Sequence, residues 1–190
     1  MEPIKTTFHD KFRVSSARAD WHDYNGGAYF VTICTQNREH FFGEIENGEM
    51  ILSEIGEYAN QNIFEIPKHN PYSEIPLWVV MPDHIHMIVI INHDRLPHEK
   101  RSIVVETFHE TSLQVVKPIV RATQMQSWLS VVVRQFKQSV TRFARTKKPY
   151  FAWQTRYYDR IIRNQDEMNK IAIYIENNVA KWGEGCEVDY

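Results

Sequence analysis

The clearest alternation of apolar and polar positions lies in residues 127–146, where apolar side chains recur at intervals of three and four. This spacing is typical of an amphipathic helix. Ser127 stands just before the first turn and has the side chain of a helix N-cap. The apolar stripe consists of Leu129, Val132, Val133, Phe136, Val140 and Phe143, with Arg134, Lys137 and Arg145 off it.

Shorter patterns predict the elements that precede this helix. Residues 26–37, "GGAYFVTICTQN", are rich in β-formers and predict a strand, and "FFGEIENGEMILS" predicts a hairpin or β-turn at its Asn-Gly pair. Residues 53–66 carry helical spacing after Ser53, and we expect Pro67 to end that helix.

The run "IPLWVVMPDHIHMIVII" is too long for one strand, and Pro82-Asp83 is a turn pair. We therefore predict two strands, 76–81 and 84–91, in a tight hairpin. Residues 92–126 show no clean period and predict a loop excursion.

The C-terminal part is predicted to be mostly helical. Residues 156–163, "RYYDRIIR", have helical spacing, although a short strand fits them as well. Asn164 is a candidate N-cap for a helix over 165–178, with Ile171, Tyr174 and Ile175 facing inward.

The order of these elements predicts an α+β fold, a ferredoxin-like antiparallel sheet with helices packed on one face. All 190 residues are expected to form a single domain. It would carry an N-terminal extension over 1–20, the excursion over 92–126 and a C-terminal helix within 164–182.

Composition narrows the class of protein. Hydrophobic residues make up 43% and charged residues 24%, as in ordinary globular domains. The two cysteines, Cys34 and Cys186, form neither a disulfide framework nor a CxxC metal site. The sequence has no signal-like apolar segment and no run as long as a membrane span, so we expect a cytoplasmic protein.

The net charge of −2 hides a local excess of positive charge. Residues 127–163 contain one acid, Asp159, and nine cations, a concentration that favours binding to a polyanion. The alternative is a solvated helix face, but the basic run continues past the helix into "KKPYFAWQTRYY". The candidate DNA-binding residues are Arg134, Lys137, Arg142, Arg145, Lys147, Lys148, Arg156, Arg160 and Arg163.

His84 and His86 stand two apart on a predicted strand, so their side chains point to the same face. Two neutral imidazoles at this spacing can chelate one divalent ion, while Ile85, Met87 and Val89 point into the core. The alternative is a pair of hydrogen-bonded, partly buried histidines. Two ligands do not complete a metal site, so a third group must come from elsewhere.

Tyr157 and Tyr158 alone are more typical of packing. Beside a metal site and a basic patch, however, a tyrosine hydroxyl is a candidate nucleophile toward a phosphodiester.

Two segments together resemble one known family. "MPDHIHMIVI" resembles the HUH motif of the HUH endonucleases, and "AWQTRYYDRIIRNQDEMNKIAIYIENNVAKW" resembles the tyrosine segment of the REP-associated tyrosine transposases. Those are single-tyrosine HUH transposases, related to small insertion-sequence transposases. The likeness covers roughly residues 12–182 and is least clear over 92–126.

The resemblance implies a metal-dependent transposase or nickase acting on single-stranded or hairpin DNA, such as a repetitive extragenic palindrome (REP). It implies Mg²⁺ or Mn²⁺ on His84 and His86, and a 5′-phosphotyrosine intermediate on Tyr158, the tyrosine before the aspartate. Because some members of the family act as monomers and others as homodimers, the resemblance implies that this chain is one or the other.

The third metal ligand is open. Many relatives have histidine where this chain has Arg160. In the family the third ligand often follows the nucleophile by about one helical turn, where this chain has Ile161 and Ile162. Asp83, Asp159 and Asn164 are candidates, as is water.

Two other functions remain possible from the sequence. A domesticated hairpin-DNA-binding protein would keep the fold and the basic patch with weak or no catalysis. A different metal-dependent phosphodiesterase or hydrolase would use His84 and His86 with water as the nucleophile, but it leaves the basic patch unexplained.

Overall fold

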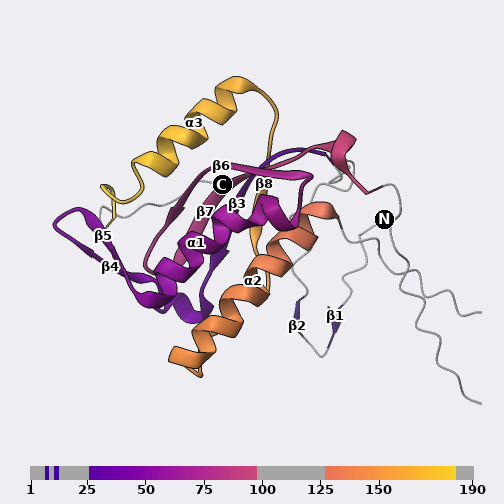
Figure 1. Ribbon diagram of the computed structural model, residues 1–190. Helices are drawn as coiled ribbons and strands as arrows, with labels where there is room; N and C mark the ends of the chain where they lie inside the picture. Colours follow the sequence, from indigo (N-terminus) through magenta and orange to yellow (C-terminus); the bar gives the residue numbers. More distant parts are fainter. Residues whose placement is uncertain (1–6, 9–10, 13–25, 98–126, 183–190) are drawn as a thin grey trace, which may run out of the picture.

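The centre of the fold is a four-stranded antiparallel sheet with the strand order β6-β7-β3-β8 (Figure 1). Its strands are β3 (Gly27–Cys34), β6 (Ser73–Val80), β7 (His84–Ile91) and β8 (Tyr158–Ile162). The computed structural model describes residues 7–8, 11–12, 26–97 and 127–182. Most of the predicted N-terminal extension (1–20) and most of the excursion (92–126) lie outside the described residues.

Chain order explains this sheet. β3 leads through helix α1 (Glu54–His69) to β6, and β7 leads toward helix α2 (Trp128–Lys147) and then β8. The two strand–helix–strand units interleave, as in a ferredoxin-like sheet. The predicted α+β class, the β6–β7 hairpin and the helix after Ser127 are therefore confirmed.

Short elements complete the described chain. The predicted Asn-Gly hairpin consists of β4 (Gly43–Glu46) and β5 (Glu49–Leu52), and both turn residues have positive φ, at 53° and 80°. Such a turn matches the twist of the flanking strands. Two turns of 3-10 helix, η1 (Gln36–Arg38) and η2 (His93–Arg95), follow β3 and β7, and β1 (Thr7–Phe8) pairs with β2 (Lys11–Phe12).

One prediction from local spacing was wrong in detail, and one that left a helix and a strand open is decided by the structure. Helix α1 continues through Pro67 to His69, since Pro67 stands in the last turn and Asn70 N still donates to Ile66 O. Residues 158–162 form the strand β8, since the free edge of β3 pairs with them from Thr32↔Tyr158 to Ala28↔Ile162. The apolar spacing of these residues fits a helix and a strand alike, and pairing with β3 decides for the strand.

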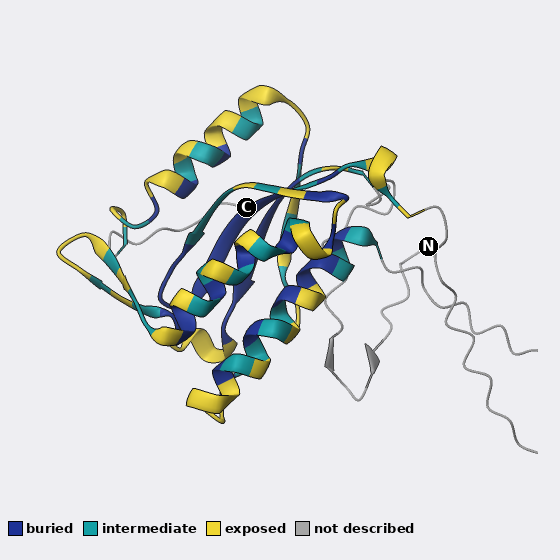
Figure 2. Cartoon of the chain, viewed as in Figure 1, coloured by how far each residue is buried: buried dark blue, intermediate teal, exposed yellow. Residues whose placement is uncertain are grey.

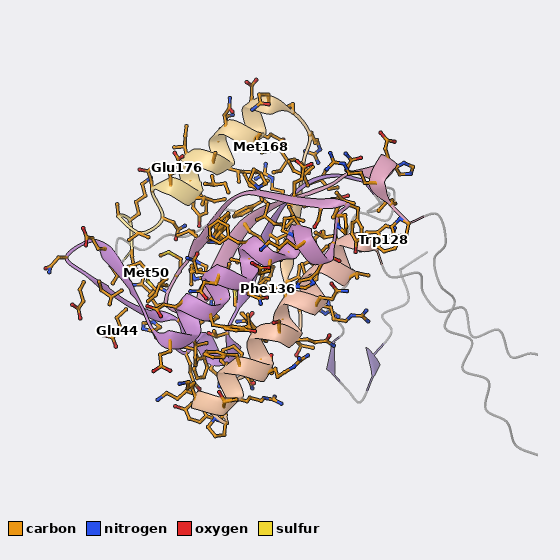
Figure 3. All side chains as sticks on the ribbon, viewed as in Figure 1. Glu44, Met50, Trp128, Phe136, Met168 and Glu176 are labelled. Atoms are coloured by element: carbon orange, nitrogen blue, oxygen red, sulfur yellow. The ribbon has the colours of Figure 1, made fainter. Side chains whose placement is uncertain are left out.

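The two faces of the sheet are covered unequally. Helices α1 and α2 pack on one face, over a core that includes Val31, Ile33 and Met87 (Figure 2). The third helix, α3 (Gln165–Glu176), packs on the opposite face over a smaller core formed by Phe30, Ile88, Ile162, Ile171 and Ile175, so the predicted packing of helices on one face holds for α1 and α2 only. Phe136 of α2 and Met168 of α3 belong to these two separate cores (Figure 3). Within the described residues, none of the helices is long and apolar enough to cross a membrane.

Candidate functional site

Strand alternation places a row of polar side chains on the face that α3 covers. In the register of the sheet, His86 lies opposite Thr32 of β3, and Thr32 lies opposite Tyr158 of β8. Since paired residues of neighbouring strands point to the same side, these three side chains share one face. His84, two residues before His86, lies on that face as well.

The two histidines converge on each other. Their Nε2 atoms are 3.0 Å apart, and the residues are only 8% and 2% exposed. Two nitrogens bound to one octahedral ion at about 2.1 Å and at right angles would also be about 3.0 Å apart. The spacing of the pair therefore fits two ligands of a single divalent ion.

The outer nitrogen of each imidazole has its own partner. His84 Nδ1 is 2.5 Å from Asp83 Oδ1, and His86 Nδ1 is 2.8 Å from Thr32 Oγ1. A carboxylate only accepts, so His84 Nδ1 donates and its Nε2 is left with a lone pair toward His86. A histidine–carboxylate pair of this kind is the usual support behind a metal-binding imidazole.

Burial and charge set the protonation of the site. Burial raises the pKa of Asp83. The hydrogen bond from His84 and the nearby charges of His84, Arg38 and His40 together lower it by more, so the net shift of this pKa is downward. Burial also lowers the pKa of His86 well below its usual value, with His84 and Arg38 adding to the effect. His86 is therefore a neutral imidazole at neutral pH, the form that can bind a metal.

Arg38 joins this site from the turn after β3. Its Nη1 is 3.4 Å from Asp83 Oδ2, while its side chain is 54% exposed. Asn37 and Arg38 both have positive φ, at 56° and 58°, a conformation that costs free energy in residues other than glycine. Buried Thr35 fixes the turn, since its Oγ1 contacts the backbone oxygens of Glu39 and Asp83. A half-exposed guanidinium is thus fixed at the edge of the histidine site.

The tyrosine that reaches the histidines is Tyr174 of α3. Its hydroxyl is 3.4 Å from His86 Nε2, and its ring packs edge-on against His86 and Phe30. Tyr158, the tyrosine favoured from sequence, shares the face but stands on β8, with β3 between it and the histidine strand, and is 52% exposed. Tyr157 lies on the α2 side, where its hydroxyl is 3.3 Å from Ser130 Oγ.

Asn178 follows Tyr174 by four residues and is 6% exposed. The chain keeps a helical course beyond α3, because Lys181 N donates to Asn177 O. Trp182, four residues further, stacks on His84 with ring centroids 6.1 Å apart. Tyr174 and Trp182 each lie against one histidine, and buried Asn178 stands four residues from both in the turns that follow α3.

The candidates for a third ligand that were drawn from the sequence serve elsewhere. Asp83 supports His84, and Asn164 caps α3 by accepting from Glu167 N. Asp159 is on the opposite face, because it alternates with Tyr158 on β8. The described residues contain no group of three His, Cys, Asp or Glu side chains suited to a metal. An asparagine amide oxygen, which that set leaves out, is a chemically suitable ligand for Mg²⁺.

The nine cations predicted to bind DNA do not form one patch. Four of them, Arg134, Lys137, Arg142 and Arg145, line one groove beside α2. Lys147 and Lys148 lie at the end of α2 beside the β4–β5 hairpin, where Lys147 pairs with Glu54. Arg160 and Arg163 approach Glu167 at 4.0 and 3.6 Å, and Arg156 is exposed just before β8.

Sequence reasoning did not single out Tyr174, Asn178 or Arg38, which the structure adds to the candidate site. Tyr174 occupies an inward-facing position of an apolar helix pattern, where a tyrosine is usually a packing residue. The available signal was the pair Tyr174 and Asn178, two polar groups one turn apart on the inward side of a helix.

Comparisons with known proteins identify a relative and a shared fold. No family model matches the chain. An uncharacterized protein of Haemophilus influenzae (strain Rd) is 33% identical over 174 residues, which cover 88% of each chain. Among solved structures, the REP-associated tyrosine transposase bound to a REP hairpin superimposes with a TM-score of 0.56 at 19% identity, over 88% of this chain and 74% of that one. The chain therefore belongs to the same protein family as the Haemophilus influenzae protein and has the fold of the REP-associated tyrosine transposase.

Proposed function

We propose that the protein is a metal-dependent single-stranded DNA transposase or nickase that cleaves and rejoins hairpin-associated DNA through a phosphotyrosine. The observation that carries the proposal is the hydroxyl of Tyr174, 3.4 Å from a histidine pair spaced to bind one divalent ion. The fold shared with a transposase bound to a REP hairpin supports the class of substrate.

His84, His86 and the amide oxygen of Asn178 would bind Mg²⁺ or Mn²⁺. The bound ion would supply a Lewis acid that polarises the phosphodiester oxygens. Asp83 and Thr32 orient the imidazoles from behind, and the bond that His84 Nδ1 donates to Asp83 leaves the Nε2 lone pair of His84 available.

Tyr174 replaces Tyr158 as the proposed nucleophile because of its distance to the histidines. The Tyr174 oxygen would form a bond to phosphorus while the bond to the 3′-oxygen breaks. The phenol proton passes to water, and the departing 3′-oxygen ends as a free hydroxyl. The 5′-phosphotyrosine stores the energy of the broken ester, so the 3′-hydroxyl can later attack it and rejoin a strand without a nucleotide cofactor.

Arg38 would contact a non-bridging oxygen of the scissile phosphate. Its guanidinium has five donors, of which one faces Asp83 at 3.4 Å, and half of the side chain is open to solvent. Charge-assisted hydrogen bonds from arginine to phosphate are short and strong. A cation there would stabilise the charge that develops on phosphorus oxygens during attack.

The experiment compares three proteins on one substrate, a hairpin-flanked single-stranded DNA with Mn²⁺, resolved on a denaturing gel. Wild type and Tyr158→Phe should form the covalent adduct, and Tyr174→Phe should form none. The two substitutions are chemically identical and differ only in position. An adduct that depends on Tyr158 and persists in Tyr174→Phe would restore the sequence-based assignment and reject this site.

A second candidate is a hairpin-DNA-binding protein without catalysis. It is favoured by one observation: the described residues contain no group of three His, Cys, Asp or Glu side chains that could hold a metal ion, since Asp83 contacts the outer nitrogen of His84. This candidate predicts salt-sensitive DNA binding by wild type with no adduct at any Mg²⁺ or Mn²⁺ concentration.

A further inference from the structure

A groove of about 890 Å³ follows one flank of α2, on the side of the sheet away from the histidines. Its lining includes the cations Arg134, Lys137, Arg142 and Arg145 and the aromatic residues Trp153 and Tyr157, with no carboxylate. Clefts of roughly 300–1,000 Å³ accommodate ligands of drug size, which is the size of one or two nucleotides.

No described residue neutralises the four cations of this groove. None of them forms a salt bridge with a described residue, whereas Lys147, Arg160 and Arg163 on neighbouring surfaces each approach a glutamate. Lys137 donates to Gln154 O, and its burial lowers its pKa. Gathering like charges in one groove is unfavourable unless an anion binds there.

The spacing of the cations fits a polymer better than a single phosphate. Arg134 and Arg145 are eleven residues apart on the helix, or about 16 Å at 1.5 Å per residue. Successive phosphates of a DNA strand rise by about 3.4 Å in a duplex, so the cations span several phosphates of one strand.

The aromatic residues of the groove are fixed in orientation. Trp153 Nε1 lies 3.2 Å from Lys137 O and 3.1 Å from Thr141 Oγ1, and the Tyr157 hydroxyl lies 3.3 Å from Ser130 Oγ. Both residues are only partly buried. Rigid aromatic rings beside a row of cations are the usual means of binding single-stranded nucleic acid, whose bases stack while its phosphates pair.

The groove and the histidine site lie on opposite faces of the sheet, but one strand joins them. Tyr157 faces the groove and Tyr158 the histidine face, and β8 is the last strand of the sheet. Exposed Arg156 and Arg160 lie along this edge.

We propose that the α2 groove binds single-stranded DNA, with phosphates on Arg134, Arg142 and Arg145 and bases against Tyr157 and Trp153, and that the same strand continues around the β8 edge to the histidine face. The choice of DNA rests on the proposed function. The groove would then retain the strand independently of the metal site.

The test measures fluorescence anisotropy of a labelled dT12 oligonucleotide with the full chain in EDTA, between 50 and 200 mM NaCl. Arg134→Gln/Arg142→Gln should bind at least tenfold more weakly, with a salt slope smaller by about 1.4, since each lost phosphate contact contributes about 0.7. Both arginines are exposed. Tyr157→Leu should weaken binding about fivefold or more with an unchanged slope, because stacking is not ionic.

The matched control is Lys68→Gln/Arg95→Gln, which removes the same charge from exposed residues that pair with glutamates outside the groove. It should bind within twofold of wild type. Unchanged binding by the groove variant, an equal loss in the control, or binding that vanishes in EDTA would overturn the proposal. Tighter binding of rU12 than dT12 by tenfold would assign the groove to RNA instead.

The two proposals fail separately. Oligonucleotide binding lost only in the groove variants supports the groove even when wild type forms no adduct. An adduct formed equally by wild type and Arg134→Gln/Arg142→Gln, with unchanged anisotropy, supports the proposed function and rejects the groove.

Discussion

The two faces of the sheet differ in what their strands contribute. On the face covered by α1 and α2, every second residue of β7, and of β3 from Tyr29 onward, is apolar and buried, as in Val31, Ile33 and Ile85. On the α3 face, apolar Phe30 and Ile88 occupy one end of the sheet, and polar Thr32, His84 and His86 occupy the other. Stability and chemistry are thus separated within single strands by the two-residue repeat.

The separation has a physical cost on the α3 face. Buried imidazoles and a buried carboxylate lose hydration, and each must find a partner in the protein. Here Thr32 and Asp83 supply those partners, and the large apolar core behind the sheet offsets what the polar row costs. Substitutions on neighbouring residues of β7 should therefore have separable effects.

The largest effect is expected from removing a histidine. His84→Ala should reduce adduct formation at least 100-fold, because the ion loses one of its ligands and the support that Asp83 gives through that ligand. The measurement is adduct yield per minute with Mn²⁺, beside a calorimetric titration of Mn²⁺. His93→Ala, in the exposed η2 turn, is the control and should match wild type. Equal Mn²⁺ affinity in His84→Ala and wild type would show that the pair is structural.

The next effect is on stability and comes from the residue between the histidines. Ile85→Ala should lower the free energy of unfolding by about 2–5 kcal/mol, because Ile85 is fully buried against α1 and α2. Urea unfolding followed by circular dichroism measures it. At low temperature the folded variant should still bind Mn²⁺ within about threefold of wild type.

The matched control for Ile85→Ala is Ile173→Ala, since Ile173 is 59% exposed on α3. Its free energy of unfolding should change by less than about 0.5 kcal/mol. If Ile85→Ala abolished Mn²⁺ binding in the folded state, the two faces would be coupled and the separation drawn above would be wrong.

Sequence reasoning succeeded where a local pattern determines the structure. The alternation on β7 and the Pro82-Asp83 turn were enough to predict the β6–β7 hairpin and to place both histidines on one face. Capping residues with helical spacing were enough to locate α2 and α3, as the side-chain bonds of Ser127 and Asn164 confirm.

The sequence was less informative where the answer depends on which surfaces of the fold come into contact. Tyr174 was predicted to face inward, but the sequence does not say that inward from α3 means the histidine face. Tyr158 was chosen from the resemblance, as the tyrosine before the aspartate, and only the strand order shows that β3 stands between it and the histidines. Residues 158–162 are likewise extended because they pair with β3, which lies about 130 residues earlier in the chain and so outside any local sequence pattern.

A smaller effect is expected at the support of the histidine pair. Asp83→Asn leaves an oxygen that still accepts from His84 Nδ1, so the fold should persist, but the neutral amide makes the imidazole a weaker ligand. Mn²⁺ affinity should fall about 10–100-fold by calorimetry. Asp94→Asn, an almost fully exposed carboxylate beyond the sheet, is the control. An affinity unchanged by Asp83→Asn would mean that the carboxylate serves only to pair with Arg38.

The smallest effect compares the two helix caps, one on each face. Ser127 accepts from Ser130 N at the start of α2, and Asn164 accepts from Glu167 N at the start of α3. Replacing either by alanine should cost about 1 kcal/mol. Because α3 covers only the small core, Asn164→Ala should speed amide hydrogen exchange within α3 alone, whereas Ser127→Ala should lower the protection of the whole sheet. A uniform loss of protection in Asn164→Ala would mean that α3 opens only when the whole domain unfolds. The histidine face would then be as stable against local opening as the main core.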